Sequence, residues 1–110
     1  MAAGNPLRAV VLGGRAWLQL RGLDDVFGQV LVLQDLSRPL AAVAGEEPAT
    51  VALRLAWCLA ATINDPLAQQ LEQTTGQSPP PPEAAGELQA RVQAVVDHGL
   101  VRGADDRRHP

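Results

Sequence analysis

The sequence predicts a small α+β domain in which an N-terminal β-hairpin packs on a bundle of three to four helices. Two observations lead to this fold class. Two apolar runs flank Gly13-Gly14 as paired strands flank a turn, and the most apolar stretch, "VALRLAWCLAATI" at residues 51–63, follows clear helix-start signals. The chain has 110 residues, of which 46% are hydrophobic, which is enough for one modest core. We therefore expect a single domain over residues 1–101.

The hairpin is expected over residues 8–20. A two-glycine loop supplies the positive φ angles that tight hairpin turns require, so residues 8–12 and 15–20 would form the two strands. Alternate side chains of a strand face opposite sides of the sheet, which places Trp17 on the face away from Leu18. Because an isolated hairpin is only marginally stable in water, this one must pack on helices.

The next segment, residues 24–36, fits two structures. Asp24 or Asp25 would cap a helix whose inner side carries Val26, Phe27, Val30, Leu31 and Leu33. The run "QVLVL" would also serve as a buried strand, and Gly28 costs a helix about 1 kcal/mol relative to alanine. We favour the helix, and we expect it to end before Pro39 because a residue that precedes proline avoids the α conformation.

Three further helices are expected over residues 48–63, 66–74 and 83–98. Pro48 suits the first turn of the first of these helices, and apolar side chains surround most of its axis, which places it at the centre of the core. Gly99 would cap the last helix, whose apolar side chains recur at helical spacing: Leu88, Val92, Val95 and Val96.

Two segments lack the periodicity of a packed element. Residues 75–82 contain four consecutive prolines, which favour an extended polyproline II linker. The same run resembles the ligands of domains with aromatic-lined grooves, but no arginine flanks it, and this favours the linker. Residues 102–110 carry mixed charges without apolar spacing, so we expect a disordered tail.

Composition excludes several classes of function. Nine basic and twelve acidic residues give a formal charge of −3, which provides no general attraction to nucleic acid. Cys58 is the only cysteine, so no disulfide or cysteine-based metal site is expected. The apolar stretch at 51–63 is shorter than the roughly 20 residues that span a bilayer, and the N-terminus lacks the features of a signal peptide. We expect a cytoplasmic protein with no membrane association, cofactor, metal or catalytic residue.

Partner binding is the role that remains for exposed apolar surface. Arg54 is nearly alone in its apolar helix; either its stem carries the guanidinium to solvent, or the guanidinium pairs with a carboxylate across a partner interface. As a hypothesis, we assign contact with a protein partner to four residues: Trp17, Phe27, Arg54 and Trp57. Whether the chain also forms a homo-oligomer is left open.

The order of segments resembles one known family. "LGGRAW" between two expected strands leads through "RGLDDV" to a helix, then to "ALRLAWCLA" ending in "IND", a polar loop, and a last helix closing with "VQAVVDHGL". Over residues 8–100 this pattern is similar to the tail assembly chaperones of long-tailed bacteriophages. The resemblance implies a non-enzymatic protein of the infected host's cytoplasm that binds the tape-measure protein, keeps its hydrophobic helices soluble and recruits tail-tube subunits.

Two other kinds of protein fit the same absence of catalytic residues. A small structural component of a phage particle, such as a connector or decoration protein, would be found in purified particles. A helical regulatory or protein-interaction module is the second alternative; a form of it that binds nucleic acid would need a basic face, and the arginines here are scattered along the chain.

Overall fold

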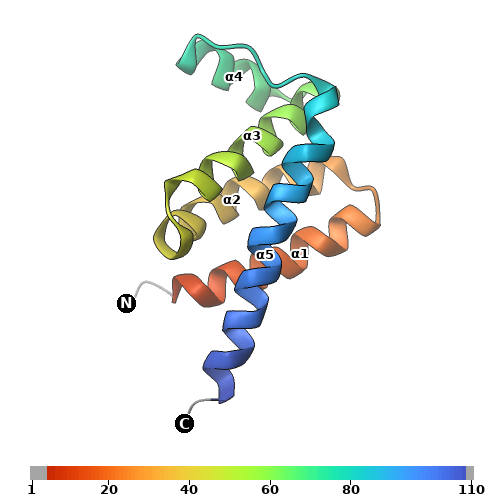
Figure 1. Cartoon of the computed structure of the whole chain (residues 1–110). Helices are drawn as coiled ribbons and strands as arrows, with labels where there is room; N and C mark the ends of the chain where they lie inside the picture. The colour runs from red at the N-terminus through yellow and green to blue at the C-terminus, as the bar shows by residue number, and fades with distance from the viewer. Residues whose placement is uncertain (1–4, 109–110) are drawn as a thin grey trace.

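The computed structural model describes residues 5–108, and the side chains of residues 5–98. These residues form five α-helices and one short 3-10 helix: α1 (Pro6–Gly22), α2 (Val26–Ala44), α3 (Glu46–Thr62), α4 (Pro66–Thr75), η1 (Pro82–Ala84) and α5 (Ala85–Arg108). Short turns join α1, α2 and α3, which pack in sequence order as an antiparallel layer, and α5 crosses this layer in contact with α1 and α3 (Figure 1).

The described residues contain no strand, so the predicted α+β class and its hairpin over residues 8–20 are wrong; the fold is all-α. Gly13 and Gly14 lie inside α1, where the missing Cβ lets neighbouring helices approach. A Cβ on Gly13 would lie 2.8 Å from Leu36 Cδ1, and one on Gly14 would lie 2.7 Å from Val96 Cγ1. The glycine pair therefore permits close helix packing and does not form a turn.

Helix α1 begins with signals that the hairpin interpretation did not use. The Asn5 side chain accepts a hydrogen bond from the Leu7 backbone N–H at 3.0 Å, and Pro6 occupies the first turn, where its missing N–H is no loss. The buried residues then follow a helical period: Val10, Val11, Gly14 and Trp17. One face of α1 thus enters the core.

Residues 24–36 adopt the helical alternative, with Asp25 as the cap that accepts from the Gly28 N–H at 2.8 Å. The sequence predicted that this helix ends before Pro39, which is wrong. The helix continues through Pro39 to Ala44. A proline inside a helix costs about 3 kcal/mol. Leu36 and Leu40, on either side, are 2% and 1% exposed, and burial of each leucine contributes about 1.5 to 3 kcal/mol. Packing therefore outweighs the local cost of Pro39.

Helix α3 lies where the sequence predicts the central helix, and it contacts α2, α4, η1 and α5. Gly45 alone joins it to α2, with a φ of 99° that favours glycine. Nine of its seventeen residues are buried, so most of its circumference is covered: Ala49, Val51, Ala52, Leu55, Ala56, Trp57, Cys58, Leu59 and Ala60. Asp65 caps α4 by accepting from the Leu67 N–H.

The proline run, which links α4 to η1, packs on the bundle. Pro80 is buried, and the Cys58 thiol donates to the Pro81 carbonyl with an Sγ to O distance of 3.5 Å. The chain therefore returns past α4 to the C-terminal end of α3, where η1 starts the last helix (Figure 1).

Helix α5 is longer than the sequence suggests. It passes through Gly99, the expected cap, and continues to Arg108. The tail expected to be disordered over residues 102–110 thus has a helical backbone over 102–108, while residues 109–110 lie outside the described part. Arginine and alanine, which favour helices, make up four of these seven residues, against one glycine.

Candidate interaction surface

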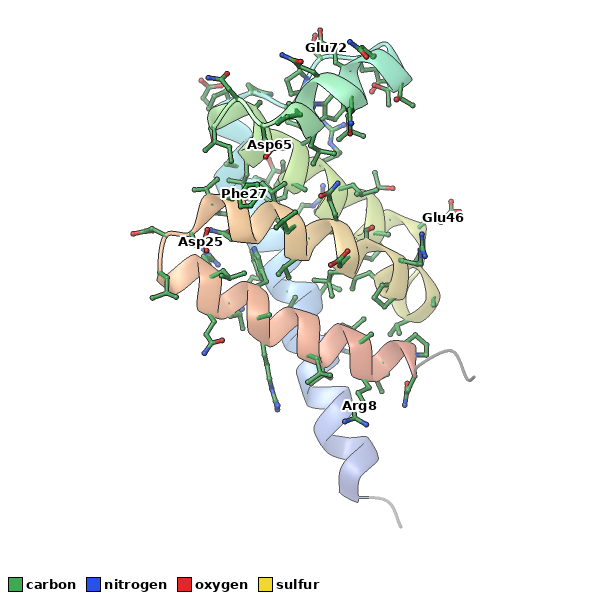
Figure 2. The ribbon with its side chains drawn as sticks, turned by 180° about the vertical axis from the view of Figure 1, so that it is seen from behind. Arg8, Asp25, Phe27, Glu46, Asp65 and Glu72 are labelled. Carbon is green, nitrogen blue, oxygen red and sulfur yellow. The ribbon has the colours of Figure 1, made fainter. Side chains whose placement is uncertain are left out.

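Helix α5 crosses one face of the layer formed by α1, α2 and α3 (Figure 1). The opposite face of the layer is turned toward the viewer in Figure 2. Six large apolar side chains are exposed in the described part of the chain, and all belong to these three helices or to the turns at their ends: Leu12, Leu23, Phe27, Leu31, Leu53 and Ile63. None of the six lies on α4, η1 or α5. The layer is therefore where apolar surface is available to a partner.

A first apolar surface lies at one end of the layer. Because α2 and α3 are antiparallel and joined by a single residue, the start of α2 lies beside the end of α3. Three exposed side chains occur at this end, and we call them the Phe27 patch: Leu23 (75% exposed), Phe27 (55%) and Ile63 (40%). In Figure 2, Phe27 is seen between the two turns that carry Asp25 and Asp65.

A second surface is an open groove of about 230 Å³ between α1 and α2, which we call the α1–α2 groove. Both helices contribute to its lining, which is mostly apolar. The lining residues are Ala9, Gly13 and Ala16 of α1 and Val32, Asp35, Leu36 and Pro39 of α2. Asp35 is the one charged residue of this lining. The exposed Leu12 lies on α1 between the groove residues Ala9 and Gly13.

The structure places both tryptophans that the sequence analysis assigned to partner binding inside the core. Trp17 is 0% exposed, and the guanidinium of Arg21 lies 5.5 Å from its ring centroid. Trp57 is 5% exposed and donates its indole N–H to the Ala68 carbonyl at 3.2 Å. Their side chains hold helices together and are not available to a partner on this surface.

The other two assigned residues lie on the surface, but not in one site. Phe27 belongs to the Phe27 patch. Arg54 is exposed on α3, nine residues before Ile63, which corresponds to about 14 Å along the helix axis. Arg54 forms no ion pair within the described residues. The four assigned residues are thus split between core and surface.

Sequence reasoning placed two of the exposed apolar side chains on the wrong side of their helix. It placed Phe27 and Leu31 on the inner side of their helix, yet they are 55% and 47% exposed. The inner face is set by the partly buried Val26 and the buried Val30 and Leu33, one or two turns apart, and a rotation of about 100° per residue carries Phe27 and Leu31 away from it. A helical reading of residues 6–22 would likewise have placed Leu12 far from Trp17 around the axis.

Cys58 is an internal thiol. Burial raises the pKa of the Cys58 thiol above its ordinary value, and the negative charge of Glu83 raises it further. Because the thiolate is the nucleophile, we expect iodoacetamide to alkylate Cys58 slowly in the native protein and rapidly in concentrated urea. Equal rates in the two conditions, measured by mass spectrometry, would contradict this placement.

No group of three or more His, Cys, Asp and Glu side chains in the described part of the chain is arranged to hold a metal ion. Within the same residues, no helix has the length and apolar character needed to cross a bilayer. Comparisons with protein-family models, curated proteins and solved structures found no match for this chain.

Proposed function

We propose that the protein is a helical interaction module that covers an apolar helix of a protein partner with its Phe27 patch. The observation that carries this proposal is the exposure of Leu23, Phe27 and Ile63 at one end of the layer. Exposed apolar clusters mark binding surfaces, and burial of a side chain of this size contributes about 1.5 to 3 kcal/mol. Binding and release of such a helix require no catalytic residue.

The specific partner we propose is the tape-measure protein of a long-tailed phage, with the host cytoplasm as the place of action. Support comes from the family resemblance, in which "ALRLAWCLA" and "IND" correspond to α3 and its end. The hairpin that opened the resemblance is replaced by α1, so this element no longer supports it. The all-helical fold also fits the alternative function, that of a helical regulatory or protein-interaction module.

Co-expression with the tape-measure protein of the same genome tests this function. The wild-type chain should keep the tape-measure protein in the soluble fraction, and the complex should persist at high salt because apolar burial is not screened. Phe27→Ser should reduce the recovered complex at least severalfold while circular dichroism stays unchanged. Leu53→Ser, which alters an exposed leucine outside the patch, should retain the complex.

Three outcomes would contradict the proposal. An insoluble tape-measure protein in the presence of the wild-type chain would exclude the tape-measure partner. Equal recovery with Phe27→Ser would exclude the Phe27 patch as the binding surface. Stoichiometric amounts of the chain in finished particles, measured by mass spectrometry, would favour a structural component over a chaperone.

A further inference from the structure

The α1–α2 groove limits the chemistry of whatever occupies it. Its walls are apolar, and the single charge in its lining is the carboxylate of Asp35. Pro39, in the same lining, has no N–H to donate to the Asp35 carbonyl one turn earlier. The groove therefore offers apolar contact beside hydrogen-bond acceptors. An occupant that matches it carries an apolar side chain next to a cation.

That combination is present on the exposed face of α1. Leu12 is 52% exposed, and exposed arginines lie on either side of it, Arg8 one turn before and Arg15 one turn after. Figure 2 shows Arg8 near the start of α1. Among the described residues, neither arginine forms an ion pair, and neither does Asp35. The chain thus presents both the groove and a segment complementary to it.

We infer that a second copy of this chain occupies the α1–α2 groove, with Leu12 of each copy inserted in the groove of the other and Arg15 of each copy paired with Asp35 of the other. Leu12 adjoins Gly13, near the middle of the groove. An antiparallel arrangement of the two α1 helices about a two-fold axis at this point therefore brings each leucine beside the opposite groove.

The ion pair follows from the same arrangement. Asp35 lines the groove from α2 and Gly13 lines it from α1, so Asp35 lies across the groove from the middle of α1. Helical side chains lean toward the N-terminus of their helix, so Arg15 leans toward Leu12. Arg15 of one copy therefore reaches the level of Asp35 in the other. The formal charge of −3 for each copy adds little long-range repulsion.

This interface is independent of the proposed function. The Phe27 patch shares no residue with the α1–α2 groove, so a dimer built on the groove leaves both copies of the patch exposed. The dimer is tested on the purified chain alone, without the tape-measure protein. A failed co-expression experiment and a failed dimerisation experiment are therefore separate results.

Analytical ultracentrifugation of the full chain over a range of concentrations is the first test. The wild-type chain should sediment as a dimer at high concentration. Leu12→Asp should raise the dissociation constant about 100-fold because it places a carboxylate in an apolar groove beside Asp35. Its circular dichroism should match the wild type since Leu12 is exposed in the monomer. Leu53→Asp, an equivalent change on α3, should leave the dimer intact.

A charge exchange is the second test. Arg15→Asp and Asp35→Arg should each weaken the dimer about tenfold, and the double variant should recover most of the wild-type affinity because the pair is restored with its signs reversed. A wild-type chain that remains monomeric at high concentration would overturn the inference and leave the groove to a different protein. A dimer that is unaffected by Leu12→Asp, or losses that simply add in the double variant, would also overturn it.

Discussion

Replacement of Trp17 by alanine is expected to lower the free energy of unfolding by about 3 to 5 kcal/mol, the largest loss from any single substitution considered for this chain. Trp17 is 0% exposed and is the largest of the fully buried side chains. Its removal leaves a cavity next to α1 and also removes the ring beneath the Arg21 guanidinium. A small domain with a total stability of about 5 to 15 kcal/mol would lose much of it.

Urea denaturation followed by circular dichroism measures this effect. The matched control is Phe27→Ala, which truncates an aromatic side chain that is 55% exposed and should cost much less. A midpoint for Trp17→Ala equal to that of Phe27→Ala would show that α1 does not bury Trp17, and the arrangement of α1 against the core would have to be abandoned.

The second large effect is expected at Gly14, where alanine should lower the free energy of unfolding by about 1 to 3 kcal/mol. A Cβ at this position would lie 2.7 Å from Val96 Cγ1, closer than carbon atoms normally approach, so either the Val96 side chain or the packing of α1 against α5 must shift. This loss outweighs the gain of about 0.5 to 1 kcal/mol that alanine normally gives a helix interior. Thermal or urea unfolding of the variant provides the measurement.

Gly22→Ala is the control for Gly14→Ala. A Cβ at Gly22, also within α1, meets no atom within 4 Å, so this change should leave the stability unchanged or raise it slightly. Coupling to Val96 identifies the cause: Gly14→Ala should cost less in a Val96→Ala background than in the wild type. Identical losses in both backgrounds would mean that the contact between α1 and α5 is not responsible.

The three later helices were predictable because local signals set them. Asp65 and Pro66 mark the start of α4, and the apolar spacing of Leu88, Val92 and Val96 marks the buried face of α5. Helix α1 was not predictable in the same way, because a Gly-Gly pair has two physical uses: it permits a turn, and it permits close helix approach. Only the presence of Leu36 and Val96 beside those glycines decides between them.

The candidate surfaces were harder to predict than the helices. The aromatic residues Trp17 and Phe27 look alike in sequence, yet one is fully buried and the other is mostly exposed. Helical periodicity separates the two, but it could be applied to Trp17 only once residues 6–22 are known to be a helix, and to Phe27 only with Val26, Val30 and Leu33 taken as the inner face. The α1–α2 groove combines residues from Ala9 to Pro39, so it exists only after two helices have packed.

The path of α5 has a consequence for synthesis on the ribosome. Helices α1, α2 and α3 make their mutual contacts as soon as residue 62 has emerged, but Val92 and Val96, which complete the core, come some thirty residues later. Arg21 on α1 likewise waits for its hydrogen-bond partner Gln93, 72 residues further along the chain. Until then, the face of the layer that α5 covers is open to solvent and to other nascent chains. Chains released before α5 is made should therefore be the aggregation-prone products of this gene.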